Sequence, residues 1–275
     1  MQFDRMRIAV RERSYLELLD LAMVVIRGHA GAWLALSLLG ILPFAIFNYW
    51  LLGLTELADL EYDIEAFPAG YVALYLLLVA WEMPLASSLV TLFFGQLMFH
   101  DQPDWGRLRS DFFNSLFQLT LIQVFCRAAM ILFTVTILVL YVVWPYMNEV
   151  ILLERNPIFA GKSHHISTFK RCTRLHEFSL GELFGRWLAS LAFGGCWVVA
   201  LWATLRWARQ IFTDQLELDQ YSFTVLFPAA LWFVVAYFNV VRYLSYLDLR
   251  IKTEGWEVEL LLRAEAAKLA RQAAP

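Results

Sequence analysis

Three polar side chains lie inside apolar runs that are long enough to cross a membrane: Asn48, Glu82 and Arg127. A charge at the centre of a bilayer is costly, and it usually faces protein or water with a partner. Counted at about 1.5 Å per helical residue from the inner ends of the expected helices, Arg127 is roughly 21 Å deep, Glu82 roughly 24 Å and Asn48 about 25 Å. The similar depths predict an ion pair between Glu82 and Arg127, with Asn48 as a candidate third member.

This intramembrane cluster has two interpretations. In the functional one it binds a proton or a solute, and Pro84 favours this because a proline kinks the helix beside Glu82. In the structural one it is a clamp that fixes the register of the helices, so removal of one charge would strand the other and destabilise the fold. We favour the clamp, and the sequence leaves both interpretations open.

Other residues that could bind a metal or do catalysis are scattered. The cysteines show no CxxC spacing, and the histidines of the basic loop have only Cys172 and Glu177 nearby as further ligands. These residues are Cys126, Cys172, Cys196, His164, His165 and His176. No phosphate-binding loop, HExxH, GxSxG or nucleic-acid motif occurs. We therefore expect no metal, no cofactor, no nucleic-acid partner and no enzymatic activity.

The basic loop itself suggests a binding role. It contains Lys162, Lys170, Arg171 and Arg174. Basic segments beside a membrane attract anionic lipid headgroups, so these four residues are our candidates for headgroup binding. The alternative is that they only orient the protein, without recognising a specific lipid.

The composition is that of a polytopic membrane protein. Of the 275 residues, 60% are hydrophobic and 17% are charged, whereas a soluble domain averages about 45–50% and 25%. One crossing takes about 20 helical residues, and the apolar runs predict six transmembrane helices. Their ranges are about 31–54, 69–99, 113–133, 135–153, 183–207 and 223–247.

The distribution of charge predicts the topology. The loop after the first span is acidic and contains no Lys or Arg, and the loop after Arg209 is acidic as well. Basic residues mark cytoplasmic loops, so the N-terminus and the segment after Leu153 should lie inside. The run from Phe112 to Leu153, with Arg127 and Glu149 as its only charges, must then cross twice. We expect both termini in the cytoplasm and the protein in a bacterial cytoplasmic (inner) membrane.

Amphipathic segments flank the spans. In residues 1–30, the stretch from Ser14 to Ile26 predicts a helix that lies in the headgroup layer or packs on the bundle. Residues 248–275 should form a cytoplasmic helix, whose apolar first turns suit the membrane surface or a protein partner. The expected domains are thus 1–30, the transmembrane domain 31–247, and 248–275.

Two groups of segments carry a resemblance to a protein family. The first joins Asn148–Pro157 (NEVILLERNP), Thr168–His176 (TFKRCTRLH) and Gly181–Trp187 (GELFGRW). The second joins Arg242–Arg250 (RYLSYLDLR) and Glu254–Leu260 (EGWEVEL). Together they resemble uncharacterised six-helix bacterial proteins related to the membrane domain of glycerophosphodiester phosphodiesterase. The resemblance implies a fold and no catalytic residues, because the catalytic barrel of the fused proteins has no counterpart in this sequence.

The sequence therefore predicts an all-α integral membrane protein without enzymatic activity. We expect a scaffold or subunit of a membrane complex that acts through its cytoplasmic helices and lipid contacts. The alternative is a transporter or lipid-handling protein with its site around Glu82 and Arg127. A polar cavity that reaches Glu82 would favour transport, and a dry, closed pair would favour the scaffold.

Overall fold

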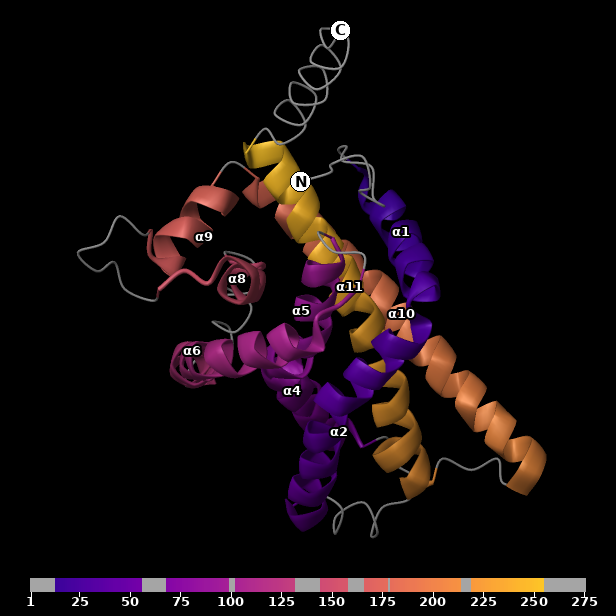
Figure 1. Ribbon diagram of the computed structural model, residues 1–275. Coiled ribbons are helices and arrows are strands. Elements are labelled where there is room, and N and C mark those ends of the chain that lie inside the picture. Colours follow the sequence, from indigo (N-terminus) through magenta and orange to yellow (C-terminus); the bar gives the residue numbers. More distant parts are fainter. Residues whose placement is uncertain are drawn as a thin grey trace, which may run out of the picture.

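The chain folds into a bundle of long helices (Figure 1). The computed structural model describes residues 13–55, 68–98, 102–131, 144–157, 166–177, 179–213 and 219–254, without the side chains at 54–55, 123–131, 213 and 254. None of the described residues forms a strand. The predicted all-α class is confirmed.

Four helices in the described part of the chain are long and apolar enough to cross a membrane. They are α2 (Ala30–Thr55), α4 with α5 (Ala69–Ala86 and Ser88–Leu97), α10 (Leu180–Thr213), and η3 with α11 (Ser222–Leu226 and Phe227–Glu254). They overlap the predicted spans 31–54, 69–99, 183–207 and 223–247. Helices of this length and composition indicate a membrane-embedded protein.

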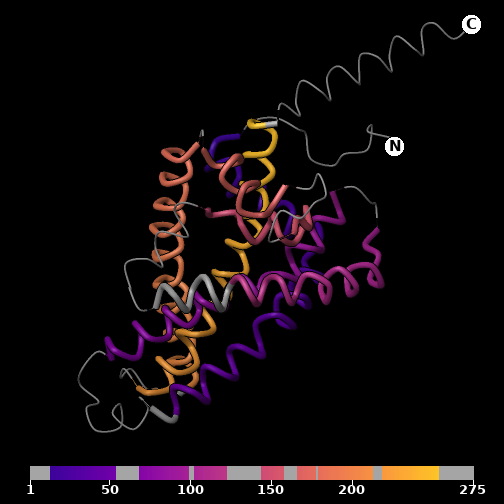
Figure 2. The backbone as a smooth tube through the Cα atoms, turned by 90° about the vertical axis from the view of Figure 1, so that its left-hand side faces the viewer, coloured from indigo at the N-terminus to yellow at the C-terminus, as the bar shows by residue number. Residues whose placement is uncertain are grey.

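The predicted spans 113–133 and 135–153 fall on a different kind of segment. Helix α6 (Trp105–Ile131) runs across the long helices in both views (Figures 1 and 2) and is not among the four apolar helices found in the described residues. Residues 132–143, which include the predicted turn, lie outside the described residues. The chain continues in α8 (Met147–Glu149) and η2 (Val150–Glu154), a π-helix that packs against α5 and α6. The six-span count stays a prediction.

The first described helix packs on the last one. Helix α1 (Tyr15–Gly28) begins at a capping box on Ser14 and buries Leu18 and Ala22 against the bundle, next to α11. Of the two arrangements expected for this segment, the structure shows packing on the bundle. The C-terminal helix expected after Glu254 lies outside the described residues.

Helix α11 is the central element of the bundle. Its first half joins an apolar cluster with α2 and α4, in which Tyr75 and Leu231 are buried. Its second half joins a larger cluster with α1, α5, α9 (Thr168–His176) and η2, in which Phe93 and Val240 are buried. Each half of α11 therefore has its own apolar partners.

Helices α2 and α4 approach most closely where α4 ends. Pro84 lies inside α4, and the helix ends at Ala86, just before Ser87. The kink predicted at Pro84 stays a prediction. A Cβ atom at Gly40 of α2 would overlap the carbonyl oxygen of Ala86. A glycine is needed there because a main-chain oxygen cannot move aside as a side chain can.

Gly40→Ala should destabilise the protein by about 1–3 kcal/mol, the usual cost of overpacking. The measurement is thermal unfolding in detergent. Gly31→Ala in the same helix is the matched control, since a Cβ at Gly31 would meet nothing within 4 Å, and it should leave stability unchanged or raise it by up to about 1 kcal/mol. Equal behaviour of the two variants would contradict the close contact.

Candidate functional site

Polar residues of the C-terminal half of α11 face other helices. Arg242, Tyr246 and Arg250 recur every four residues and so share one face of the helix. Asp248 lies on the same half and is buried. Helices α1, α9 and α10 pack around this half of α11, and they supply the partners of these side chains together with η2.

Glu149 and Arg242 form a buried ion pair. Arg242 Nη2 donates to Glu149 Oε2 at 3.0 Å, and Arg242 Nε lies 2.7 Å from Glu149 Oε1. The Glu149 side chain is 2% exposed. A buried charge requires a partner, so this pair fixes the start of η2 against α11.

Glu154 collects several donors at the other end of η2. Arg171 of α9 donates to both carboxylate oxygens, at 2.6 Å and 2.9 Å, and the Tyr246 hydroxyl donates at 2.8 Å. Arg250 Nε lies 3.6 Å away. Burial by itself would raise the pKa of Glu154, but the bonds from Arg171 and Tyr246 outweigh it and the pKa is lowered. Glu154 is therefore ionised at neutral pH.

The π-helix explains how both carboxylates reach α11. Glu149 and Glu154 are five residues apart, and i→i+5 hydrogen bonding brings such residues close to one face. In an α-helix, with about 3.6 residues per turn, they would point in clearly different directions. The wider turn of η2 therefore lets both carboxylates face α11, whose partner side chains recur every four residues.

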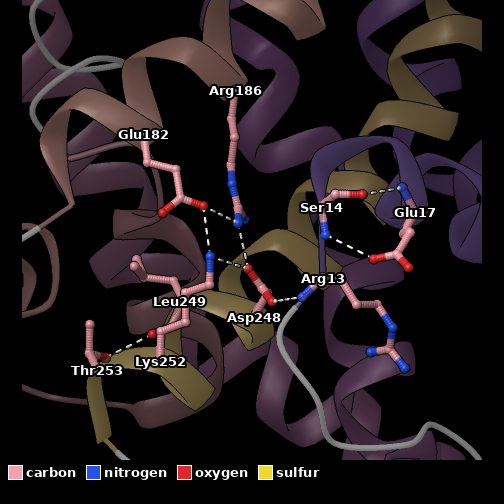
Figure 3. A network of polar contacts seen from close by, with 9 residues as sticks. All are labelled: Arg13, Ser14, Glu17, Glu182, Arg186, Asp248, Leu249, Lys252 and Thr253. Carbon is pink, nitrogen blue, oxygen red and sulfur yellow. Dashed lines mark hydrogen bonds and ion pairs between the residues drawn. The ribbon is translucent and has the colours of Figure 1, made fainter.

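A second network ties α10 and the start of the described chain to α11 (Figure 3). Arg186 Nη2 lies 2.5 Å from Asp248 Oδ2 and 2.6 Å from Glu182 Oε1. Lys252 Nζ lies 2.8 Å from Glu182 Oε1 and 3.6 Å from Asp248 Oδ2. The main-chain N–H of Arg13 donates to Asp248 Oδ1 at 2.9 Å. We call the two networks together the ion-pair platform.

His176 is a structural residue of the platform. Its Nδ1–H donates to the Cys172 carbonyl oxygen at 2.6 Å, and its Nε2 accepts from the Tyr146 main-chain N–H at 3.4 Å. These bonds require the neutral ring, and burial lowers the pKa of His176 accordingly. No group of three metal-binding side chains occurs among the described residues, and His164 and His165 lie outside them.

The four candidates for headgroup binding separate into three groups. Lys170 and Arg174 are exposed on α9 and form no ion pair with a described residue. Arg171 on the same helix instead points inward to Glu154. Lys162 lies outside the described residues. Helix α9 thus has one basic side chain in the platform and two on its surface.

The predicted intramembrane cluster is described in part. Asn48 Nδ2 donates to Glu82 Oε2 at 2.6 Å, and the two side chains are 0% and 6% exposed. On the same helix as Glu82, the Tyr75 hydroxyl accepts from Trp232 Nε1 at 3.0 Å. Helix α6 packs against α4, but the side chain of Arg127 lies outside the described residues, so the Glu82–Arg127 ion pair stays a prediction.

Sequence reasoning missed the ion-pair platform because it took Arg186, Arg242 and Arg250 for orientation signals. A signal was present in the sequence. The positive-inside rule needs no acidic residues, yet the segments that carry the family resemblance contain as many Asp and Glu as Lys and Arg residues. The acidic ones that prove to be partners are Glu149, Glu154, Glu182 and Asp248.

Comparison with known proteins adds no relative: no protein family matches the chain, and neither a curated protein nor a solved structure matches it.

The chemistry of the platform is that of a structural element. Each of its carboxylates is neutralised by a guanidinium or ammonium group, and its histidine is held neutral by two main-chain bonds. A nucleophile needs an adjacent base or a lowered pKa, whereas burial raises the pKa of the Cys172 thiol to about 12. The arrangement fixes helices together and activates no group.

Glu149→Gln should destabilise the protein by about 3–5 kcal/mol, because it leaves Arg242 with an unpaired charge in the interior. Glu149→Gln/Arg242→Gln should recover part of this loss, as a double-mutant cycle of detergent-solubilised protein would measure. Asp20→Asn, on the exposed face of α1, is the control and should change stability by less than about 0.5 kcal/mol. Additive single-variant losses would show that the pair is not coupled.

Proposed function

We propose that the protein is a non-enzymatic, multi-pass protein of a bacterial cytoplasmic membrane that acts as a scaffold or as a subunit of a membrane complex. The observation that carries this proposal is the ion-pair platform. Its charges pair with one another across η2, α9, α10 and α11. The platform therefore holds these helices in a fixed arrangement rather than forming a reactive site, and a fixed arrangement of helices is what a docking scaffold requires.

The resemblance stated for the sequence becomes part of this proposal. The segments that carry it hold the residues that meet in the platform, namely Glu149, Glu154, Arg171, Arg186, Arg242 and Asp248. Shared motifs that form one contact network are expected when they preserve a fold. We therefore propose kinship with the membrane domain of glycerophosphodiester phosphodiesterase, without its catalytic barrel.

The proposed orientation puts the platform in the cytoplasm. Most of the basic residues near the ends of the four candidate spanning helices lie at the platform. The main-chain N–H of Arg13 also contacts Asp248 there. Any even number of crossings, four or six, leaves both ends of the described chain on this side. The positive-inside rule then assigns that side to the cytoplasm.

We propose four crossings, because four helices of the described chain are long and apolar enough to span a membrane and α6 runs across them (Figures 1 and 2). Asp111 of α6 pairs with Arg155, and Gln118 donates to the Asn156 carbonyl oxygen at 2.9 Å. The outer face of α6 is mixed, since Phe113 and Phe117 are 63% and 74% exposed and Arg109 is exposed as well. A helix in the interfacial layer can present both kinds of side chain.

Spin labels on α6 should therefore all report one depth. The variants are Arg109→Cys, Phe113→Cys and Phe117→Cys in a background without the native cysteines, with depth taken from collisions with oxygen and a nickel chelate in vesicles. Labels at Leu34, Leu38 and Leu42 of α2, which are all exposed and have the same four-residue spacing, are the matched series and should deepen by about 6 Å from one label to the next. A similar gradient along α6 would support the six-span arrangement instead.

The exposed face of α9 is the proposed contact with anionic headgroups. Lys170 and Arg174 lie four residues apart on this face, and the bond of Arg171 to Glu154 holds the helix in a fixed position. A basic residue near an anionic surface contributes about 1 kcal/mol. Two such residues on a rigid helix form a weak but oriented lipid contact.

Lys170→Gln/Arg174→Gln should remove about 2 kcal/mol of the stabilisation that added phosphatidylglycerol gives over phosphatidylcholine. The measurement is thermal unfolding of the detergent-solubilised protein with each lipid. Arg206→Gln, near the other end of α10, controls for the loss of positive charge as such. If the double variant keeps the full preference for phosphatidylglycerol, α9 is not the headgroup site.

A further inference from the structure

Glu82 differs from the other buried carboxylic residues of the protein. The described residues include four that are less than a tenth exposed: Glu82, Asp111, Glu149 and Asp248. Asp111, Glu149 and Asp248 each pair with an arginine. Glu82 forms no ion pair with any described side chain, and it lies in a helix that is apolar enough to span the membrane.

A buried carboxylate in this setting needs either a cation or a proton. Transfer of an unpaired ion from water into an apolar medium is so unfavourable that the group is neutralised instead. Arg127 on α6 is the one cation predicted for this place, and the second solution is a proton on Glu82 itself. The contacts of Asn48 distinguish between the two.

The Asn48 amide is better suited to a protonated partner. Its Nδ2 lies 2.6 Å from Glu82 Oε2, so the neutral amide and the carboxyl group are in direct contact. Its Oδ1 has no hydrogen-bond partner among the described residues, although Asn48 is fully buried. A buried acceptor without a donor is costly.

A proton on Glu82 supplies a donor for that oxygen. A carboxylate can only accept and so can bond the amide nitrogen alone, whereas a carboxyl group has an O–H donor beside an acceptor oxygen and can bond both ends of the amide. The nitrogen and oxygen of an amide have the same shape, so the hydrogen bonds decide its orientation. With the proton on Glu82, the Asn48 carbonyl oxygen becomes the acceptor of an O–H···O bond.

We propose that Glu82 and Asn48 form a proton-binding site within the membrane span, with the proton on Glu82 and the Asn48 carbonyl oxygen as its acceptor. The inference rests on the proposed membrane embedding and on no other part of the proposed function. A carboxyl group that gains and loses a proton at this depth is what proton-coupled transport would require, so the site gives the transport alternative a defined chemistry.

The surroundings of Glu82 contain few other groups that titrate. Its own helix contributes Tyr75 and Tyr71, α2 contributes the neutral Asn48, and α11 contributes Trp232, which donates to Tyr75. Helix α6 packs on the same helix and carries Arg127, whose side chain is not described. The test therefore has to separate a proton on Glu82 from an ion pair with Arg127.

The test uses the full chain in lipid vesicles and two readouts at neutral pH. Infrared spectroscopy detects the C=O stretch of a protonated carboxyl group, and dicyclohexylcarbodiimide, which reacts with protonated carboxyl groups in apolar surroundings, reports the same state by mass spectrometry. We expect a carboxyl band that disappears in Glu82→Gln and shifts in Asn48→Leu. We expect labelling at Glu82 and none at Glu149, the matched buried carboxylate that is held by an arginine.

Arg127→Gln supplies the decisive comparison. If Glu82 is protonated in the native chain, this variant leaves the band and the labelling unchanged. If the band is absent in the native chain and appears in Arg127→Gln, Glu82 is an ionised partner of Arg127 and the proposal is wrong. Absence of the band in both chains also overturns it. None of these results affects the lipid preference of α9, so the two proposals fail independently.

Discussion

The burial of charge along α11 is the constraint on which the rest of the structure depends. An arginine, an aspartate and a second arginine in the C-terminal half of one apolar helix can be accommodated only if other segments bring countercharges to them. Glu149 and Glu154 arrive on η2, and Arg186 arrives on α10. Helices that are distant in sequence are thereby docked around α11 at defined positions, which apolar packing alone would not specify.

The same constraint explains why the ion-pair platform keeps its ionisable groups in fixed protonation states. Catalysis and ion transfer use groups whose charge can change, and a fully paired ion is held in one state. The lowered pKa of Glu154 and the neutral ring of His176 both fix the protonation of the platform near neutral pH. The contact between α2 and α4 has the opposite character, since Glu82 is buried there beside a neutral amide.

Length and hydropathy were sufficient to predict α2, α4, α10 and α11, because these features are local. The similar depths of Asn48 and Glu82 pointed to two residues that do contact each other. The direction of α6 across the other helices could not be predicted from these local features. A mixed face such as that of Arg109, Phe113 and Phe117 suits a membrane span and an interfacial helix alike. The ion pairs were missed because pairing depends on register between distant helices, which a single sequence does not show.

The π-helix sets a limit on how this protein can vary. A π-turn contains one more residue than the α-turn that it replaces. Loss of one residue between Glu149 and Glu154 would leave the two carboxylates four residues apart, a spacing that an ordinary α-helix already places on one face. Relaxation to an α-helix at constant length is what the ion pairs exclude, because two residues five apart would then point in clearly different directions. The number of residues in this segment and its type of helical turn should therefore change together among descendants of this chain.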